Sequence, residues 1–246
     1  MFASQYGPRR GYYVGISQKL GDPEKTTGVM PGFYTKATRP ASTAYDWTGL
    51  YVGANFGGDF SAGEHVLTPI GWGATNPSGA LGGLQFGYNY LVTPNWLVGA
   101  EAELGWTSAQ GKTNFVDPAG TASLSVTSDH NWYDTVSGRV GYVMGPLMLY
   151  GKGGTAWMNA SYRMDVNSGL DGVTQANATR SGWIAGGGLE YMLGTHWSAK
   201  LEYDHLRFGS QTLAFANPFG NTATFDTDVN QVKAGVNYHL EGLFSR

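Results

Sequence analysis

Residues 96–106 constrain the fold of this chain more than any other segment. Every second residue from Trp96 to Trp106 is apolar, whereas the residues between them include Glu101 and Glu103. Alternation with a period of two is typical of a β-strand that has one apolar and one polar face. The two tryptophans would stand about 33 Å apart along a strand, at roughly 3.3 Å per residue. At a tilt of about 40° this corresponds to about 25 Å of height, which matches the apolar band of an outer-membrane β-barrel.

Seven other segments show the same alternation. The eight expected strands cover residues of about 48–59, 79–90, 96–106, 131–143, 147–157, 180–193, 197–208 and 227–240. The connections between them are alternately long and short, as in bacterial outer-membrane barrels with short periplasmic turns and longer external loops. The sequence therefore predicts an all-β protein, an eight-stranded antiparallel up-and-down transmembrane β-barrel over residues 45–240. Both ends of the barrel are expected in the periplasm and the long loops outside the cell.

The positions of the aromatic residues favour a membrane barrel over a soluble barrel of the lipocalin kind. A soluble barrel would have an apolar inside and a charged outside, whereas here the charged residues share their face with glycines. We expect two aromatic girdles at the lipid interfaces. Tyr90, Trp96, Tyr142, Tyr191, Trp197 and Tyr238 lie beside the short turns, and Phe56, Trp106, Trp132, Trp157 and Trp183 lie beside the long loops.

The composition agrees with this fold and excludes several classes of function. Charged residues make up 13% of the chain, against about 25% in average soluble domains. The mean hydropathy is −0.24, and no run of 18 apolar residues predicts a membrane-spanning helix. The absence of cysteine excludes disulfides and thiolate metal sites. The net charge of −3 argues against general nucleic-acid binding.

The inner face of the predicted barrel carries charges of both signs. The acidic residues there are Glu101, Glu103, Glu190, Glu202 and Asp204, and the basic residues are Arg139, Lys152, Lys200 and Lys233. Side chains can fill the interior of an eight-stranded barrel, and unpaired charges would be costly there. We therefore expect an interior charge network, formed by Glu101, Glu103, Arg139, Lys152, Glu190, Lys200, Glu202 and Lys233, that closes the barrel. The alternative is a narrow diffusion channel along this polar face.

No catalytic, cofactor-binding or metal-binding set is expected. The five histidines lack the spacing of a helical metal site. His205 and Asp204 face opposite sides of a strand, and Ser161, Ser181 and Ser210 show no arrangement with a histidine and an acid. A lipid A-modifying enzyme is therefore the weakest of the alternatives.

Residues 1–44 differ from the rest of the chain. They contain four prolines and six basic residues with weak periodicity, which predicts an extended or flexible N-terminal arm. The apolar core of a signal peptide is missing. One hypothesis is that this arm contacts peptidoglycan or a partner membrane protein, and the other is a disordered tail. Residues 241–246 are expected to form a short C-terminal tail.

Several motifs together resemble one family. Residues 45–55 read YDWTGLYVGAN and resemble the W-T-G-[FL]-Y-[VI]-G opening of small alphaproteobacterial outer-membrane β-barrels, which are often labelled porin-family or outer-membrane surface-antigen proteins. The second, fourth, fifth and seventh strands of that family are similar to residues 82–89, 139–142, 149–154 and 200–203. The resemblance covers residues 45–240.

The resemblance implies a structural role in envelope integrity and surface interaction, with contacts to outer-membrane lipid and lipopolysaccharide and without a cofactor. It also implies a signal for the barrel assembly machinery. Lys233, Gly235, Tyr238 and Leu240 are similar to that C-terminal signal, although this chain continues for six residues beyond Leu240. Open-channel activity does not follow from the resemblance.

Overall fold

The structure is a computed structural model that describes residues 2–4, 15–17, 45–61, 64–68, 71–116, 123–167, 172–214 and 222–240. The chain divides into two compact units, Met1–Ala44 and Tyr45–Arg246. In the first unit, β1 (Phe2–Ser4) pairs antiparallel with β2 (Gly15–Ser17). Most of the predicted arm and all of the predicted tail lie outside the described residues. Within the described ranges, no helix is long and apolar enough to cross a membrane.

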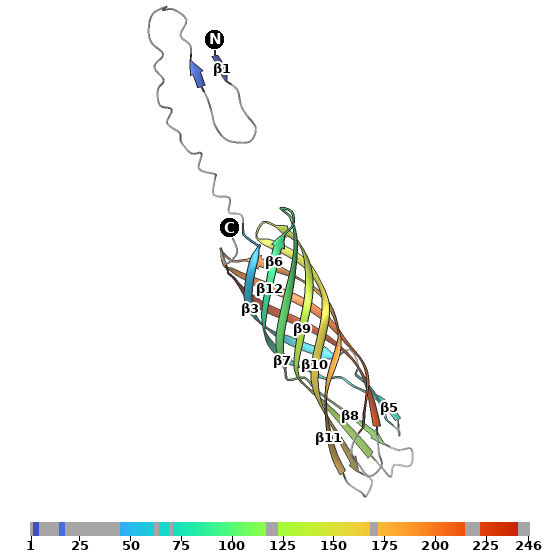
Figure 1. Cartoon of the computed structure of the whole chain (residues 1–246). Helices are drawn as coiled ribbons and strands as arrows, with labels where there is room; N and C mark the ends of the chain where they lie inside the picture. The colour runs from blue at the N-terminus through green and yellow to red at the C-terminus, as the bar shows by residue number, and fades with distance from the viewer. Residues whose placement is uncertain are drawn as a thin grey trace, which may run out of the picture. The chain divides into compact units, whose positions relative to one another are not determined.

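Eight strands of the second unit form a closed antiparallel ring (Figure 1). They are β3 (Gly49–Ser61), β6 (Ser78–Leu91), β7 (Trp96–Thr107), β9 (Ser123–Met144), β10 (Leu147–Asn167), β11 (Gly172–Met192), β12 (Trp197–Ala214) and β13 (Thr222–Leu240). Each of these strands pairs with the next one along the chain, and β13 also pairs with β3, where Leu240 lies opposite Leu50. The predicted eight-stranded antiparallel up-and-down barrel is confirmed.

The period-two alternation sorts the side chains between the inside and the outside of this ring. On β7, Glu101 and Glu103 are buried, whereas Trp96 and Trp106 are more than half exposed. The same alternation continues on the other ring strands. Large apolar side chains such as Phe56, which is 70% exposed, cover the outer wall. An apolar outer wall around a charged interior is the reverse of a soluble barrel, and it suits a lipid environment.

The two ends of the ring differ. One end has the short connections at residues 92–95, 145–146 and 193–196, and we call it the short-turn end. Gly145 in the shortest turn has a φ of +62°, a left-handed conformation that glycine adopts without a steric penalty. The chain enters β3 and leaves β13 at this same end, because Gly49 pairs with Asn89 and Leu240 pairs with Leu50. We call the opposite end the long-loop end.

The long connections between the predicted strands contain strands themselves, so the expectation that these connections are loops is wrong in this respect. The structure places β4 (Glu64–Thr68), β5 (Gly71–Thr75) and β8 (Gln110–Val116) there, and β9 to β13 continue into these regions. These segments are rich in Ser, Thr, Asn and Gly, so apolar and polar residues do not alternate clearly along them. Threonine nevertheless fits a strand well, because it is β-branched.

These additional strands build a second layer of structure at the long-loop end. Pairing of β11 with β12 stops at Gly182 and Phe208. Beyond that point β8, β9, β10 and β11 form one sheet, and β12, β13, β4 and β5 form another. A buried apolar cluster joins the two sheets and includes Val66 of β4, Phe115 of β8 and Phe225 of β13. We call this region, with β4, β5, β8 and the adjoining ends of β9 to β13, the extension.

Candidate functional site

The predicted interior charge network lies inside the ring, and all eight of its predicted residues are buried there. They come from β7, β9, β10, β11, β12 and β13, because alternate residues of each strand point inward. Asp204, which the sequence places on the same inner face, is buried among them. The structure thus brings together nine charged side chains from strands that are far apart in the sequence.

Lys233 and Lys152 are the cations with the most contacts in this network. The Lys233 ammonium lies 2.7 Å from both the Glu103 and Asp204 carboxylates and 3.2 Å from Glu202. The Lys152 ammonium lies 2.7 Å from Glu202 and 3.1 Å from Asp204. Both lysine side chains are fully buried. Their carboxylate partners supply the compensation that a buried charge requires.

Arg139 and Lys200 extend the network toward the short-turn end. The guanidinium of Arg139 lies 3.6 Å from Glu101 and 3.4 Å from Glu190. The Lys200 ammonium lies 3.7 Å from Glu101 and 3.3 Å from Glu202. With Asp204 included, five carboxylates face four cations, so the network is close to neutral.

Three tyrosines connect the network to the barrel wall. Tyr51 donates a hydrogen bond to Glu101, Tyr133 donates one to Glu103, and Tyr150 donates one to Glu202. Each tyrosine lies directly opposite a glycine of the neighbouring strand, in the pairs Tyr51–Gly87, Tyr133–Gly105 and Tyr150–Gly188. A methyl group on any of these glycines would contact the tyrosine too closely. Glycine therefore allows each ring to lie across the adjacent strand and reach its glutamate.

The carboxylates Glu101, Glu103 and Glu202 also form the one cluster of possible metal ligands found among the described residues. Their oxygens lie within 4.8 Å of one another, and carboxylate oxygens are ligands that hard cations prefer. The Lys152 ammonium, however, lies 3.4, 3.8 and 2.7 Å from these three side chains. Lysine already supplies the positive charge at this position, so the arrangement suits an ion-pair network rather than a metal centre.

A serine, a histidine and an acid meet near the short-turn end, although the sequence shows no such arrangement. Ser198 donates a hydrogen bond to Glu190, and its Oγ lies 3.0 Å from His239 Nε2. The same Nε2 lies 3.5 Å from Glu190 Oε1. In a catalytic triad the histidine contacts the serine through one ring nitrogen and the acid through the other, whereas here Nε2 of His239 faces both Ser198 and Glu190, so this is not the geometry of a triad. All three side chains are also buried.

Buried apolar clusters lie inside the ring on both sides of the network. The cluster toward the short-turn end contains Trp47, Leu97, Val143, Met148, Tyr150 and Met192. Trp47, from the motif at residues 45–55, is fully buried and donates a hydrogen bond to the Gly145 carbonyl oxygen. The cluster toward the long-loop end contains Tyr133, Ala156, Met158, Ile184, Leu206, Phe208 and Val229. The interior is therefore a stack of apolar and charged layers.

A second buried polar cluster follows beyond these layers, in the extension. The Glu64 carboxylate accepts hydrogen bonds from Thr75, Tyr162 and Thr227. Arg180 donates to Thr227 and lies 3.9 Å from Glu64. This cluster was not predicted, because the chain around Glu64 carries no clear strand pattern.

Comparison with known proteins decides the family. The family model described as outer membrane protein beta-barrel domain matches residues 35–239. The chain belongs to this family. The 31 kDa outer-membrane immunogenic protein of Brucella melitensis biotype 1 is 27% identical over 208 residues, which cover 79% of this chain and 80% of the relative. The 22 kDa outer membrane protein of Rhizobium leguminosarum bv. viciae is 26% identical over 200 residues, which cover 80% of each chain.

Solved structures of outer-membrane proteins also align with the chain. OprG from Pseudomonas aeruginosa is 14% identical, with a TM-score of 0.48, and the match covers 78% of this chain and 98% of OprG. Ail from Yersinia pestis is 15% identical, with a TM-score of 0.38, and the match covers 78% of this chain and 99% of Ail. The family match and the curated relatives confirm the resemblance found in the sequence. This chain is an outer-membrane β-barrel protein.

The aromatic residues predicted to form girdles lie on the outer wall of this barrel. Trp96 and Tyr142 pair near the short-turn end with ring centroids 5.2 Å apart, and Trp197 and Tyr238 pair there at 5.0 Å. The other predicted girdle members are Phe56, Tyr90, Trp106, Trp132, Trp157, Trp183 and Tyr191, and all except Trp132 are more than a third exposed. Such amphipathic rings are suited to the two membrane–water interfaces.

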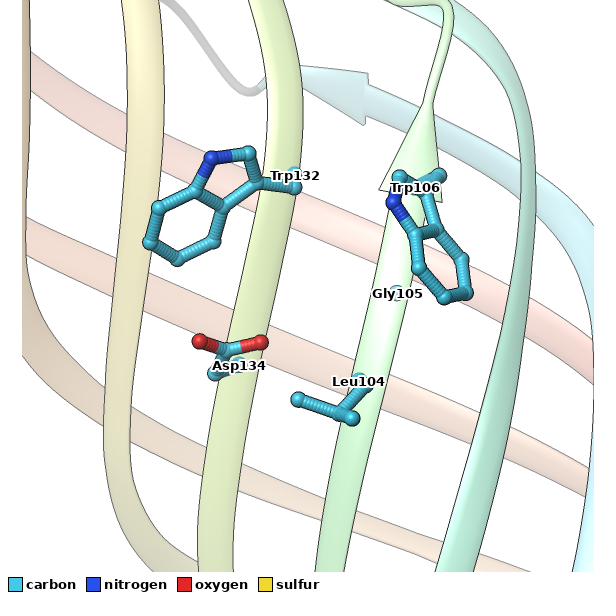
Figure 2. Close-up of a pocket in the computed structure, with 5 residues that line it drawn as sticks. All are labelled: Leu104, Gly105, Trp106, Trp132 and Asp134. Carbon is cyan, nitrogen blue, oxygen red and sulfur yellow. The ribbon is translucent and has the colours of Figure 1, made fainter.

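A pocket opens on this outer wall where Trp106 of β7 pairs with Trp132 of β9. Leu104, Gly105 and Asp134 complete its lining (Figure 2). Asp134 was not among the predicted site residues, although it shares the outward face of its strand with Trp132. This alternation with Trp132 was the only feature of the sequence that indicated the outward position of Asp134.

Proposed function

We propose that this protein is a closed, non-catalytic structural barrel that also carries a surface-exposed extension. The filled interior is the observation that carries this proposal. A diffusion channel would need a continuous polar path, whereas buried apolar clusters around Met148 and around Leu206 lie on either side of the charge network. The narrow channel, which is the alternative, is therefore less well supported.

The contacts of Ser198, His239 and Glu190 argue against a lipid A-modifying enzyme. Ser198 is fully buried and His239 is 4% exposed, so a lipid substrate has no access to them. The Glu190 carboxylate accepts from both Ser198 and Asn237 and pairs with Arg139. These contacts give Glu190 a structural role in closing the barrel.

The orientation of the barrel is also part of the proposal. We place the short-turn end, where the chain enters β3 and leaves β13, in the periplasm, and the extension outside the cell. Short periplasmic turns and longer external connections are the usual arrangement in such barrels. The name of the Brucella relative describes it as immunogenic, which fits a protein with external segments.

The partners follow from this orientation. The outer wall would contact outer-membrane lipid and lipopolysaccharide through its aromatic girdles. Lys233, Gly235, Tyr238 and Leu240 lie on β13, the strand that closes the ring against β3, and they are proposed to be read by the barrel assembly machinery. Residues 1–44 would reach peptidoglycan or a partner membrane protein in the periplasm.

A strain that lacks the gene is expected to be more sensitive to detergent, and a plasmid copy is expected to restore resistance. Because the chain has no cysteine, the plasmid copies can carry Lys112→Cys in β8 of the extension or Val92→Cys in a short turn. A membrane-impermeant maleimide applied to intact cells should label only the Lys112→Cys protein. Both proteins should be labelled after lysis.

Two results would contradict the proposal. Normal detergent resistance and unchanged vesiculation in the deleted strain would remove the structural role. Labelling of Val92→Cys rather than Lys112→Cys in intact cells would reverse the orientation while leaving the barrel itself unaffected.

A further inference from the structure

Asp134 is a carboxylate on a wall that is otherwise mostly apolar. It lies opposite Leu104 of β7 on one side and Trp157 of β10 on the other, and Trp132 and Val136 are its outward neighbours on β9. Asp134 makes no hydrogen bond or ion pair with any residue that the structure describes. A charged side chain facing lipid is unfavourable, so a cation from the membrane would stabilise this carboxylate.

The surroundings of Asp134 define the chemistry of that partner. In Figure 2 the indole of Trp132 lies next to the Asp134 carboxylate along β9, and Leu104 and Trp106 line the pocket from β7. A carboxylate attracts a cation, and a tryptophan face attracts the same cation through its π system. The pocket offers no basic group to an anion, and its indoles offer no oxygen ligands.

We propose that this pocket binds the ammonium group of a lipid headgroup. A lipid is the appropriate source, because the pocket lies on the outer wall within the aromatic girdle, and the exposed side chains of Leu104, Trp106 and Val136 surround it. A divalent cation fits less well, since Ca²⁺ takes six to eight oxygen ligands and the pocket provides a single carboxylate. The bound ammonium would neutralise Asp134 and fix a lipid at the Trp106–Trp132 pair.

The test measures which lipids the full-length protein retains. The protein is purified in detergent, mixed with equal amounts of phosphatidylethanolamine and phosphatidylglycerol with identical acyl chains, and analysed by native mass spectrometry. The wild type should retain more phosphatidylethanolamine. Asp134→Asn should lower the ratio of the two retained lipids by up to about fivefold, the loss expected from one exposed carboxylate–ammonium pair. Asp165→Asn, which removes an exposed carboxylate paired with Arg163 in the extension, should leave the ratio unchanged.

Two further comparisons establish the chemistry. N-acetylated phosphatidylethanolamine, which lacks the ammonium, should be retained no better than phosphatidylglycerol. Trp132→Phe should keep more of the preference than Trp132→Leu, because only phenylalanine retains a π face. Heat-modifiable gel migration shows that each variant is a folded barrel.

An equal lipid ratio for folded wild type and folded Asp134→Asn would overturn the proposal. Retention of phosphatidylglycerol that requires Mg²⁺ and disappears with a chelator would also overturn it, because a metal-bridged phosphate would then be the ligand.

Discussion

Replacing Lys233 with methionine is expected to lower the free energy of unfolding of the barrel by about 3–5 kcal/mol, the usual cost of breaking a buried ion pair. Methionine keeps an unbranched side chain but removes the ammonium that lies 2.7 Å from both Glu103 and Asp204. Lys152 would then be their remaining cation, at 3.8 and 3.1 Å. Urea unfolding in lipid vesicles, followed by tryptophan fluorescence and by heat-modifiable gel migration, measures the change.

Two further variants show whether the loss of stability comes from buried carboxylates that have lost their cation. Lys112→Met removes an exposed lysine of β8 and should change stability by no more than about 0.5 kcal/mol. Adding Glu103→Gln and Asp204→Asn to Lys233→Met leaves three carboxylates facing three cations, and it should recover part of the loss. Equal effects of Lys233→Met and Lys112→Met would show that the network does not hold the barrel together.

The second large effect is expected at Gly105. Gly105→Ala should destabilise the barrel by about 1–3 kcal/mol, the range for overpacking a filled interior. The added methyl group would overlap the ring of Tyr133, which is 1% exposed and held by its 3.0 Å hydrogen bond to Glu103. Urea unfolding under the same conditions measures this change.

Gly151→Ala on β10 provides the matched control. Gly151 faces outward, and the nearest heavy atom to an added methyl group would be 3.8 Å away, so this change should be close to neutral. Gly105→Ala combined with Tyr133→Ala should cost less than the sum of the two single changes, because the second removes the ring that the first displaces. Additive losses would contradict the proposed contact between Gly105 and Tyr133.

The sequence predicts the barrel and its two faces well, because the inward or outward direction of a side chain depends only on the period of the strand. Glu101, Glu103 and Trp96 are assigned to the correct faces on that basis. The sequence cannot predict which charges meet across the lumen. Lys233 and Glu103 are 130 residues apart and lie on strands that are not neighbours, so their contact depends on ring closure and register.

The same limit explains the two arrangements that sequence reasoning did not find. Ser198, His239 and Glu190 meet through the register of β11, β12 and β13, which no local pattern encodes. The cluster at Glu64 depends on β4 and on the ends of long strands in the extension. Because apolar and polar residues do not alternate clearly in those segments, their sequences are similar to those of loops. Asp134, in contrast, could have been recognised from its alternation with Trp132.

The claim that the interior is closed is tested most directly by electrical recording. The purified full-length protein is reconstituted into lipid vesicles, its folded state there is verified by heat-modifiable migration, and the vesicles are then fused with planar lipid bilayers. Because the charge network and both apolar clusters fill the lumen, no conductance steps are expected across the usable voltage range. Stable and reproducible steps from the folded wild-type protein would show an open path and contradict the closed barrel.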